Sequence, residues 1–239
     1  MRVVVALPTK NEEAGIREMI VGIREAGFRD IIVVDEMSTD HTVLLALREG
    51  AAIYQRDGRG KGYAIVKALE VAASCEVEAL AILDADCTYP PRFIPVLLQE
   101  LADHDMVVGT RDLRKLAYLH EVANRLHTWT INYLYGVRLH DINSGMRVLR
   151  VKQFADRIEG CGFDIEAQLT IRAIRGGLRV REVPIEYVAE RKGRSKIKAW
   201  DAFRILRRIL TEWRGFRANG VRVSGRRGPR VSNAQDAVR

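Results

Sequence analysis

The residues best suited to chemistry are two carboxylates that directly follow a short apolar run. Asp84 and Asp86 flank Ala85 immediately after Ala79–Leu83, a segment that predicts a buried strand. Residues two apart on an extended chain point the same way, so both carboxylates can face one ligand. Carboxylate oxygens suit Mg²⁺ or Mn²⁺, and Mg²⁺ completes its shell with water and substrate phosphates. The alternative for so short a motif is a pair of loop carboxylates that cap the next helix.

Similar polar residues stand at the ends of two other apolar runs. Asp35 directly follows Ile31–Val34, and a carboxylate at such an edge can accept hydrogen bonds from a base or a ribose. Pro8 and Glu12 bound the polar segment that follows Val3–Leu7. An ordinary turn aspartate and an ordinary helix cap are the alternatives for these two segments.

Basic side chains supply the complementary charge. Arg111 follows the apolar run Met106–Gly109, and further isolated basic residues are Arg147, Arg191 and Lys196. The planar fork of arginine suits phosphate, and lysine adds a point charge. A solvated surface role is the alternative for each of them.

Several other kinds of site are excluded. The glycine-rich segment Gly58–Gly62 is not a P-loop, because Lys61 is followed by glycine rather than by Ser or Thr. It predicts a turn into a helix, with Lys61 available to phosphates. No Ser-His-Asp or Cys-His arrangement is apparent, and the histidines lack metal-ligand spacing. Cys75, Cys87 and Cys161 are scattered and odd in number, which argues against a disulfide framework and fits a reducing cytoplasm.

Short apolar runs that alternate with helical periods must position these residues. The predicted strands of the first half are Val3–Leu7, Ile31–Val34, Ala51–Tyr54, Ala79–Leu83 and Met106–Gly109. Strands that alternate with helices predict an α/β fold with a mostly parallel sheet and helices on both faces. Ligands of such sheets bind beyond the carboxyl ends of the strands, which is where the polar residues gather.

The second half of the chain predicts longer elements and a polar end. We expect helices near 122–135 and 163–174, a strand at 178–188 and a basic helix at 197–213. The chain has 239 residues, which suits one α/β domain over 1–213 and a basic, disordered tail over 214–239.

The basic helix is amphipathic. Apolar residues recur on one of its faces at Trp200, Phe203, Leu206, Leu210 and Trp213. Lysines and arginines surround this stripe, which suits an anionic membrane surface, and packing of the stripe against the domain is an equal alternative. No apolar run is longer than five residues, so we expect neither a membrane-spanning segment nor a signal peptide.

The net charge of +8 indicates an anionic partner. A nucleic-acid-binding protein is one interpretation of this charge and of the sequence pI of about 9.6. The chain has no nucleic-acid recognition motif, and the acidic strand ends oppose such binding. We therefore expect no nucleic-acid partner.

Seven segments, taken in order, resemble the family 2 glycosyltransferases of GT-A fold, and among them the dolichol-phosphate mannose synthase group. They are LPTKNE (7–12), VVDEMSTD (33–40), LDADCTYPP (83–91), VGTR (108–111), DINSGMR (141–147), EVPIEY (182–187) and RKGRSK (191–196). The resemblance implies an inverting transfer of a sugar from a nucleotide sugar to dolichyl or polyprenyl phosphate at the cytoplasmic face of a membrane. GDP-mannose is the first candidate for the nucleotide sugar. UDP-glucose or a similar donor, and a non-lipid acceptor, are the alternatives.

The resemblance also implies roles for single positions near the nucleotide and the phosphates. Pro8, Glu12 and Asp35 resemble residues that contact the nucleotide. The segment Asp84–Asp86 resembles the metal and diphosphate centre, which binds Mg²⁺ or Mn²⁺. Asp86 and Arg111, which resembles an arginine beside the phosphates, are the expected catalytic residues.

Ser144 resembles a turn residue beside the acceptor. Arg191, Ser195 and Lys196 resemble a basic segment that closes over the donor. An acceptor phosphate monoester has a second pKa of about 6, so it is already a nucleophile at neutral pH. No strong general base is then required, which agrees with the lack of an evident catalytic histidine.

Departures from the family pattern affect the metal and the donor. Glu36 replaces the second Asp of a usual pair, and Thr88 stands where members with a third metal ligand have Gln. Glu190 stands where some relatives are basic. The longer members of the group also have a C-terminal transmembrane segment, which we do not find here.

Overall fold

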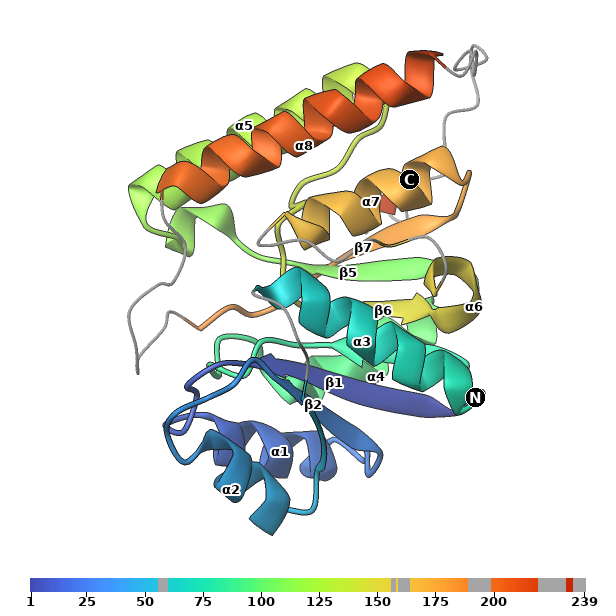
Figure 1. Cartoon of the computed structure of the whole chain (residues 1–239). Helices are drawn as coiled ribbons and strands as arrows, with labels where there is room; N and C mark the ends of the chain where they lie inside the picture. The colour runs from blue at the N-terminus through green and yellow to red at the C-terminus, as the bar shows by residue number, and fades with distance from the viewer. Residues whose placement is uncertain (56–59, 156–157, 159–163, 189–198, 219–230, 234–239) are drawn as a thin grey trace.

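A mixed sheet crosses the centre of the computed structural model, with helices packed on both of its faces (Figure 1). The structure describes residues 1–55, 60–155, 158, 164–188, 199–218 and 231–233. The strands are β1 (Val3–Thr9), β2 (Ile31–Asp35), β3 (Ala52–Gln55), β4 (Ala79–Ile82), β5 (Met106–Thr110), β6 (Arg147–Arg150), β7 (Val180–Pro184) and β8 (Val231–Asn233). Their order is β3-β2-β1-β4-β6-β5-β7-β8, and β6 alone runs antiparallel to its neighbours.

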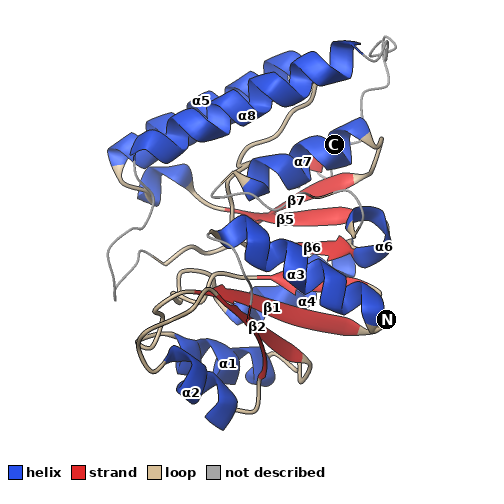
Figure 2. Ribbon diagram, in the orientation of Figure 1, coloured by secondary structure: helices blue, strands red, loops and turns tan. Residues whose placement is uncertain are grey.

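Eight α-helices connect or flank these strands in the described part of the chain (Figure 2). They are α1 (Ile16–Glu25), α2 (Thr42–Arg48), α3 (Lys61–Ser74), α4 (Ile94–Glu100), α5 (Tyr118–Tyr135), α6 (Val151–Phe154), α7 (Ile165–Arg175) and α8 (Ala199–Ala218). Two short 3₁₀ helices precede α4 and α5, at Pro91–Phe93 and Leu113–Lys115.

The sheet separates two hydrophobic cores, because successive side chains of a strand point to opposite faces. In β1, Val4 and Ala6 join a core with α3, α5, α6, α7 and α8. Val5 and Leu7 join a second core with α1, α2 and α4. A strand that is covered on both faces must be apolar throughout, which explains the continuous apolar runs of the sequence.

Helices α5 and α8 lie side by side along one end of the molecule (Figure 1). Ile205 and Ile209 anchor α8 in the core, and the Trp213 indole Nε1–H donates to the Leu134 carbonyl of α5 at 3.2 Å. The Arg208 guanidinium of α8 pairs with the Asp164 carboxylate at 2.7 Å, just before α7 begins. The basic helix is therefore packed into the domain through one of its faces.

The predicted α/β fold with a mostly parallel sheet is confirmed, and the differences concern particular elements. The sequence analysis did not find β6, and it expected a longer strand than β7. The expected domain boundary at residue 213 falls inside α8, which continues to Ala218. The tail expected to be disordered contributes Val231–Asn233, which pair with β7. These three residues can join the sheet because β7, among the described residues, otherwise has a free edge on that side.

No helix in the described ranges is both long enough and apolar enough to cross a membrane.

Candidate active site

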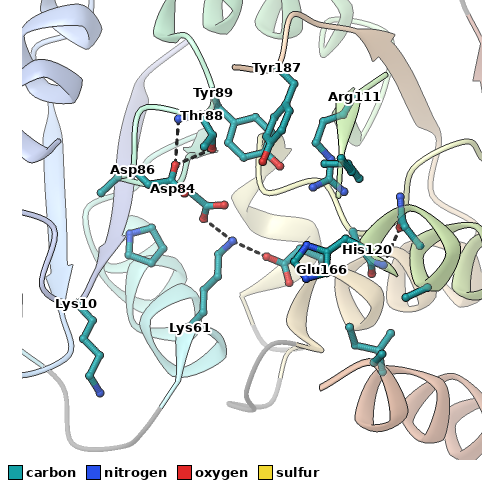
Figure 3. A pocket seen from close by; sticks show the side chains of 18 of the residues that line it. Lys10, Lys61, Asp84, Asp86, Thr88, Tyr89, Arg111, His120, Glu166 and Tyr187 are labelled. Carbon is teal, nitrogen blue, oxygen red and sulfur yellow. Dashed lines mark hydrogen bonds and ion pairs between the residues drawn. The ribbon is translucent and has the colours of Figure 1, made fainter. Parts of the chain in front are cut away.

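A cavity of about 470 Å³ opens at the carboxyl ends of β1, β4 and β5 (Figure 3). Six of the residues that the sequence analysis selected line it together, which are Pro8, Glu12, Asp84, Ala85, Asp86 and Arg111. They are up to about a hundred positions apart in the sequence and meet because parallel strands end at the same edge of the sheet.

The two carboxylates after β4 have different surroundings. The Asp86 carboxylate accepts hydrogen bonds from the backbone N–H of Thr88 at 3.0 Å and from its hydroxyl at 2.6 Å. Burial and the neighbouring Asp84 charge raise the pKa of Asp86, and the Thr88 hydrogen bonds oppose that rise. Thr88, which departs from the family pattern, thus supports a carboxylate of the candidate site.

Asp84 has a cation in direct contact. The Lys61 ammonium, at the first residue of α3, forms ion pairs with the Asp84 carboxylate and, at 2.6 Å, with Glu166 of α7 (Figure 3). Burial by itself lowers the pKa of Lys61, but Asp84 and Glu166 outweigh it and raise the pKa above its ordinary value. The ammonium is therefore charged at neutral pH. The sequence analysis did not select Glu166. The one signal for it in the sequence is an acidic residue in the first turn of a predicted helix.

The loop before β6 presses against Asp84. A Cβ added to Gly145 would collide with the Asp84 carboxylate and would lie 3.1 Å from the Tyr89 ring. The Gly145 N–H donates to the Tyr89 hydroxyl at 2.9 Å, and Tyr89 is buried. Only glycine leaves room for this approach, so the loop and the carboxylate form one packed unit.

Arg111 is oriented by a buried carboxylate. Its Nε and Nη2 donate to the two oxygens of Asp141 at 2.7 and 2.8 Å, and its guanidinium lies 5.6 Å from the Tyr187 ring centroid. The Asn124 side chain donates to the same carboxylate at 2.9 Å. Burial alone would raise the pKa of Asp141, but the charge and hydrogen bonds of Arg111 hold it below its ordinary value. The pair fixes a positive group at the cavity wall.

A polar chain connects this pair to α8. The Asn143 amide donates to Asn124 Oδ1 at 2.7 Å and lies 3.1 Å from His127 Nδ1. The His127 Nε2 lies 2.9 Å from the Ala202 carbonyl oxygen. Burial lowers the pKa of His127, so the ring is neutral, with Nε2–H as donor to Ala202 and Nδ1 as acceptor from Asn143. The sequence analysis did not select any of these residues.

Three selected residues lie in the described structure but do not line the cavity. The Asp35 carboxylate is 1% exposed and accepts hydrogen bonds from Ser38 N and Oγ, while Glu36 lines the cavity. The Ser144 hydroxyl donates to the Gly109 carbonyl oxygen. Arg147 is buried, and its guanidinium donates to Thr170 Oγ1 at 2.9 Å and to carbonyls of the loop before β6.

For Arg147, neither of the roles considered from the sequence is correct. Its guanidinium neither lines the cavity nor faces solvent, because the loop before β6 turns its carbonyls inward and requires buried donors. Arg191, Ser195 and Lys196, together with Glu190, lie outside the described residues, as do Gly58, Arg59 and Cys161.

Comparison with known proteins adds independent findings. The model of glycosyl transferase family 2 matches residues 4–156. The low-salt glycan biosynthesis hexosyltransferase Agl6 of Haloferax volcanii is 32% identical over 89% of this chain. The match covers 54% of Agl6, so the chain spans about half the length of that relative.

Two other relatives match over most of their own length. A dolichyl-phosphate hexose transferase of Haloferax volcanii is 29% identical, over 81% of this chain and 85% of the relative. An undecaprenyl-phosphate mannosyltransferase of Micrococcus luteus is 28% identical, over 82% of this chain and 88% of the relative.

The fold also matches a solved structure. Glucosyl-3-phosphoglycerate synthase from Mycobacterium tuberculosis, in complex with Mn²⁺, UDP-glucose and phosphoglyceric acid, aligns with a TM-score of 0.75 at 20% identity. The alignment covers 100% of this chain and 91% of that protein. At this identity the likeness establishes the arrangement of the elements and nothing about the ligands of this chain.

Proposed function

The chain belongs to glycosyl transferase family 2, and from this membership we propose that it transfers a sugar from a nucleotide sugar to a polyprenyl phosphate, with inversion at the anomeric carbon. The observation that carries the proposal is one cavity that holds Asp84, Asp86 and the guanidinium of Arg111. Such a cavity can accept a cation-bound diphosphate and a second phosphate group together.

Asp84 and Asp86 are the residues that would hold a divalent cation, Mg²⁺ or Mn²⁺. Among the described residues, no group of three or more His, Cys, Asp or Glu side chains could hold a metal ion by itself. Two carboxylates at a cavity wall fit a cation that takes its remaining ligands from water and substrate phosphates. When bound, the cation neutralises the charge of the diphosphate leaving group. The solved neighbour, which has the same arrangement of elements, also contains Mn²⁺.

The nucleotide end of the donor is assigned to the last residues of β1 and to the loops that follow β1 and β2. Pro8 and Glu12 line the cavity there, beside Glu36. Asp35 is held by Ser38, so it acts on the nucleoside either by ordering this loop or by exchanging Ser38 for the ligand. We assign Arg191, Ser195 and Lys196 to the donor as well, on the resemblance of RKGRSK alone.

The acceptor end is assigned to Arg111 and to the loop that contains Ser144. A phosphate monoester has a second pKa of about 6, so it attacks without a strong base, and the protein has to position it and balance its charge. Arg111 can do both because Asp141 fixes the direction of its guanidinium. The names of two relatives, which act on dolichyl and undecaprenyl phosphate, support a lipid phosphate.

For the donor we propose GDP-mannose, in agreement with the named mannosyltransferase relative. UDP-glucose is the second candidate, because the solved neighbour holds UDP-glucose in the same fold. The same neighbour holds phosphoglyceric acid, which makes a small phosphorylated acid the second candidate for the acceptor.

We also propose that the protein binds an anionic membrane from its cytoplasmic side. An apolar row, here called the α5 stripe, runs along one exposed face of α5 and consists of Tyr118, Leu119, Val122, Leu126, Trp129 and Tyr133. Trp129 is 62% exposed and Tyr133 is 74% exposed, and their rings stack at 5.5 Å. Leu119 belongs both to this stripe and to the cavity lining. A lipid tail on the stripe could therefore leave its phosphate in the cavity.

Helix α8, which packs beside α5, adds charge at the same end of the molecule (Figure 1). Phe203, Arg207, Leu210 and Arg214 recur at spacings of four, three and four, so they share one face of α8, and all are exposed. Aromatic and leucine side chains among arginines suit the interface of an anionic bilayer. The proposed surface thus includes α5, whereas the sequence alone indicated only residues 197–213.

The test is an assay of a panel of labelled nucleotide sugars against a short-chain polyprenyl phosphate, with Mg²⁺ or Mn²⁺ and with excess chelator. We expect transfer that requires the cation, and a loss of about 10²–10³-fold in kcat for Asp86→Ala, the order seen when transition-state charge stabilisation is removed. Asp103→Ala, at an exposed turn after α4, is the matched control and should retain full activity. Transfer to phosphoglyceric acid but not to the lipid phosphate would favour the second acceptor, and no transfer with any pair would refute the proposal.

A further inference from the structure

Lys61 brings an ammonium group into contact with one of the carboxylates that we assign to the cation. Its ammonium contacts Asp84 and Glu166 at once, its side chain is only 14% exposed, and it lines the same cavity (Figure 3). A buried lysine between two carboxylates is more than a surface ion pair, because screening by solvent is weak there.

The backbone of Lys61 and one side of the Asp84 carboxylate are each constrained by their surroundings. Lys61 is the first residue of α3, after Gly60 with its φ of 115°, so its backbone is set by the start of the helix. Behind Asp84, the close approach of Gly145 leaves no room for the carboxylate to retreat. A divalent cation bound to Asp84 and Asp86 would therefore lie close to an ammonium group. Like charges at such a distance in a partly buried site repel strongly.

A nucleoside diphosphate changes this balance. Its phosphate oxygens carry negative charge that both the divalent cation and the Lys61 ammonium can face, so the repulsion between the two cations is offset. Glu166, at 2.6 Å, gives the ammonium a second carboxylate that stays available when the cation takes Asp84. Lys61 can then remain charged in the cavity beside the bound cation.

We propose that Lys61 is a positioning residue that makes binding of the divalent cation and binding of the nucleoside diphosphate depend on each other. The proposal rests on the assignment of Asp84 and Asp86 to the cation. With Lys61 in contact with Asp84, the cation binds weakly alone and tightly with the nucleotide. Because such coupling is reciprocal, the cation strengthens nucleotide binding by the same factor.

The test measures Mn²⁺ binding to the protein from the electron paramagnetic resonance signal of free Mn²⁺, first without nucleotide and then with GDP or UDP, after subtraction of the Mn²⁺ that the nucleotide binds in protein-free solution. In Lys61→Met the Mn²⁺ affinity without nucleotide should rise on the order of tenfold, and the enhancement by nucleotide should shrink by a similar factor. Lys67→Met, the same change on a half-exposed lysine six residues further along α3 that pairs with Glu70 at 3.4 Å, should behave as the wild type. Lys61→Arg keeps the charge and should keep most of the coupling.

An unchanged or weakened Mn²⁺ affinity in folded Lys61→Met would overturn the proposal. Glu166→Gln gives a second test that does not depend on the folding of that variant. It removes the alternative carboxylate and leaves the ammonium to Asp84, so Mn²⁺ alone should bind several-fold more weakly, and an unchanged affinity would also overturn the proposal. Asp86→Ala tests the assignment of the cation site separately from the role of Lys61. If the protein still binds Mn²⁺ together with the nucleotide in this variant, the assignment of the cation to Asp84 and Asp86 is wrong.

Discussion

The buried pair of Arg111 and Asp141 supports a quantitative prediction about stability and acceptor binding. The Asp141 side chain is fully buried, and it accepts hydrogen bonds from Arg111 at 2.7 and 2.8 Å and from Asn124 at 2.9 Å. Asp141→Asn keeps the shape but removes the charge, which leaves the guanidinium of Arg111 buried without a counter-ion. Breaking a buried pair in this way costs about 3–5 kcal/mol.

Because Asn retains one acceptor oxygen, we expect a loss near the lower end, about 3 kcal/mol in the free energy of unfolding. Urea denaturation followed by circular dichroism would measure it. The matched control is Asp112→Asn, which changes a half-exposed aspartate that pairs with Arg114 at 2.9 Å, and it should lower the free energy of unfolding by less than about 1 kcal/mol. In the transfer assay, Asp141→Asn should also raise the KM for the acceptor, since Arg111 loses its fixed direction.

The reasoning would be refuted by a loss below about 1 kcal/mol for Asp141→Asn, the range of exposed pairs. It would also fail if Arg111→Ala combined with Asp141→Ala were no more stable than Asp141→Ala alone. In the double variant no unpaired buried charge remains, so part of the stability should return.

Three further predictions concern the nucleotide, pH and the membrane. Asp35→Ala should raise the KM for the donor more than it lowers kcat, because a nucleoside contact acts in the ground state and the transition state alike. Steady-state kinetics with varied donor would measure both constants, and a large loss of kcat at unchanged KM would contradict this role. The hydrogen bond to Glu182 raises the pKa of His140, so its stabilisation is complete below the unfolded value of about 6.5 and is lost as pH rises through the folded pKa. Unfolding at pH 6 and pH 9 should therefore differ less for His140→Gln than for the wild type, and equal differences would contradict this. Replacing Trp129 and Tyr133 together by Ser should weaken co-sedimentation with acidic vesicles, while activity on a detergent-dispersed acceptor should remain. Vesicle binding that changes neither with these substitutions nor with the charge of the vesicles would exclude this surface.

The amino-acid sequence determined the features that depend on local pattern. Strands covered on both faces are apolar throughout, so β1, β2, β4 and β5 were predicted close to their observed bounds. The carboxyl ends of parallel strands share one edge, so Asp84, Asp86 and Arg111 were expected to lie together, and they line one cavity. Helix α8 was found from its periodicity, but not the way in which it packs.

The tertiary structure decided everything that depends on contacts between distant segments. Arg147 is the first residue of β6, and a search for apolar runs does not find a strand that begins with a charged residue. The buried guanidinium of Arg147 is tolerated because carbonyls of the preceding loop accept its hydrogen bonds. Lys61 and Glu166 are about a hundred residues apart, and the ion pairs of Lys61 with Asp84 and with Glu166 follow only from the packing of α3 and α7 on one face of the sheet. The charge balance of the cavity, and with it the proposed dependence of the cation on the nucleotide, comes from that packing, because electrostatic energies depend on separation and burial in three dimensions rather than on spacing along the chain.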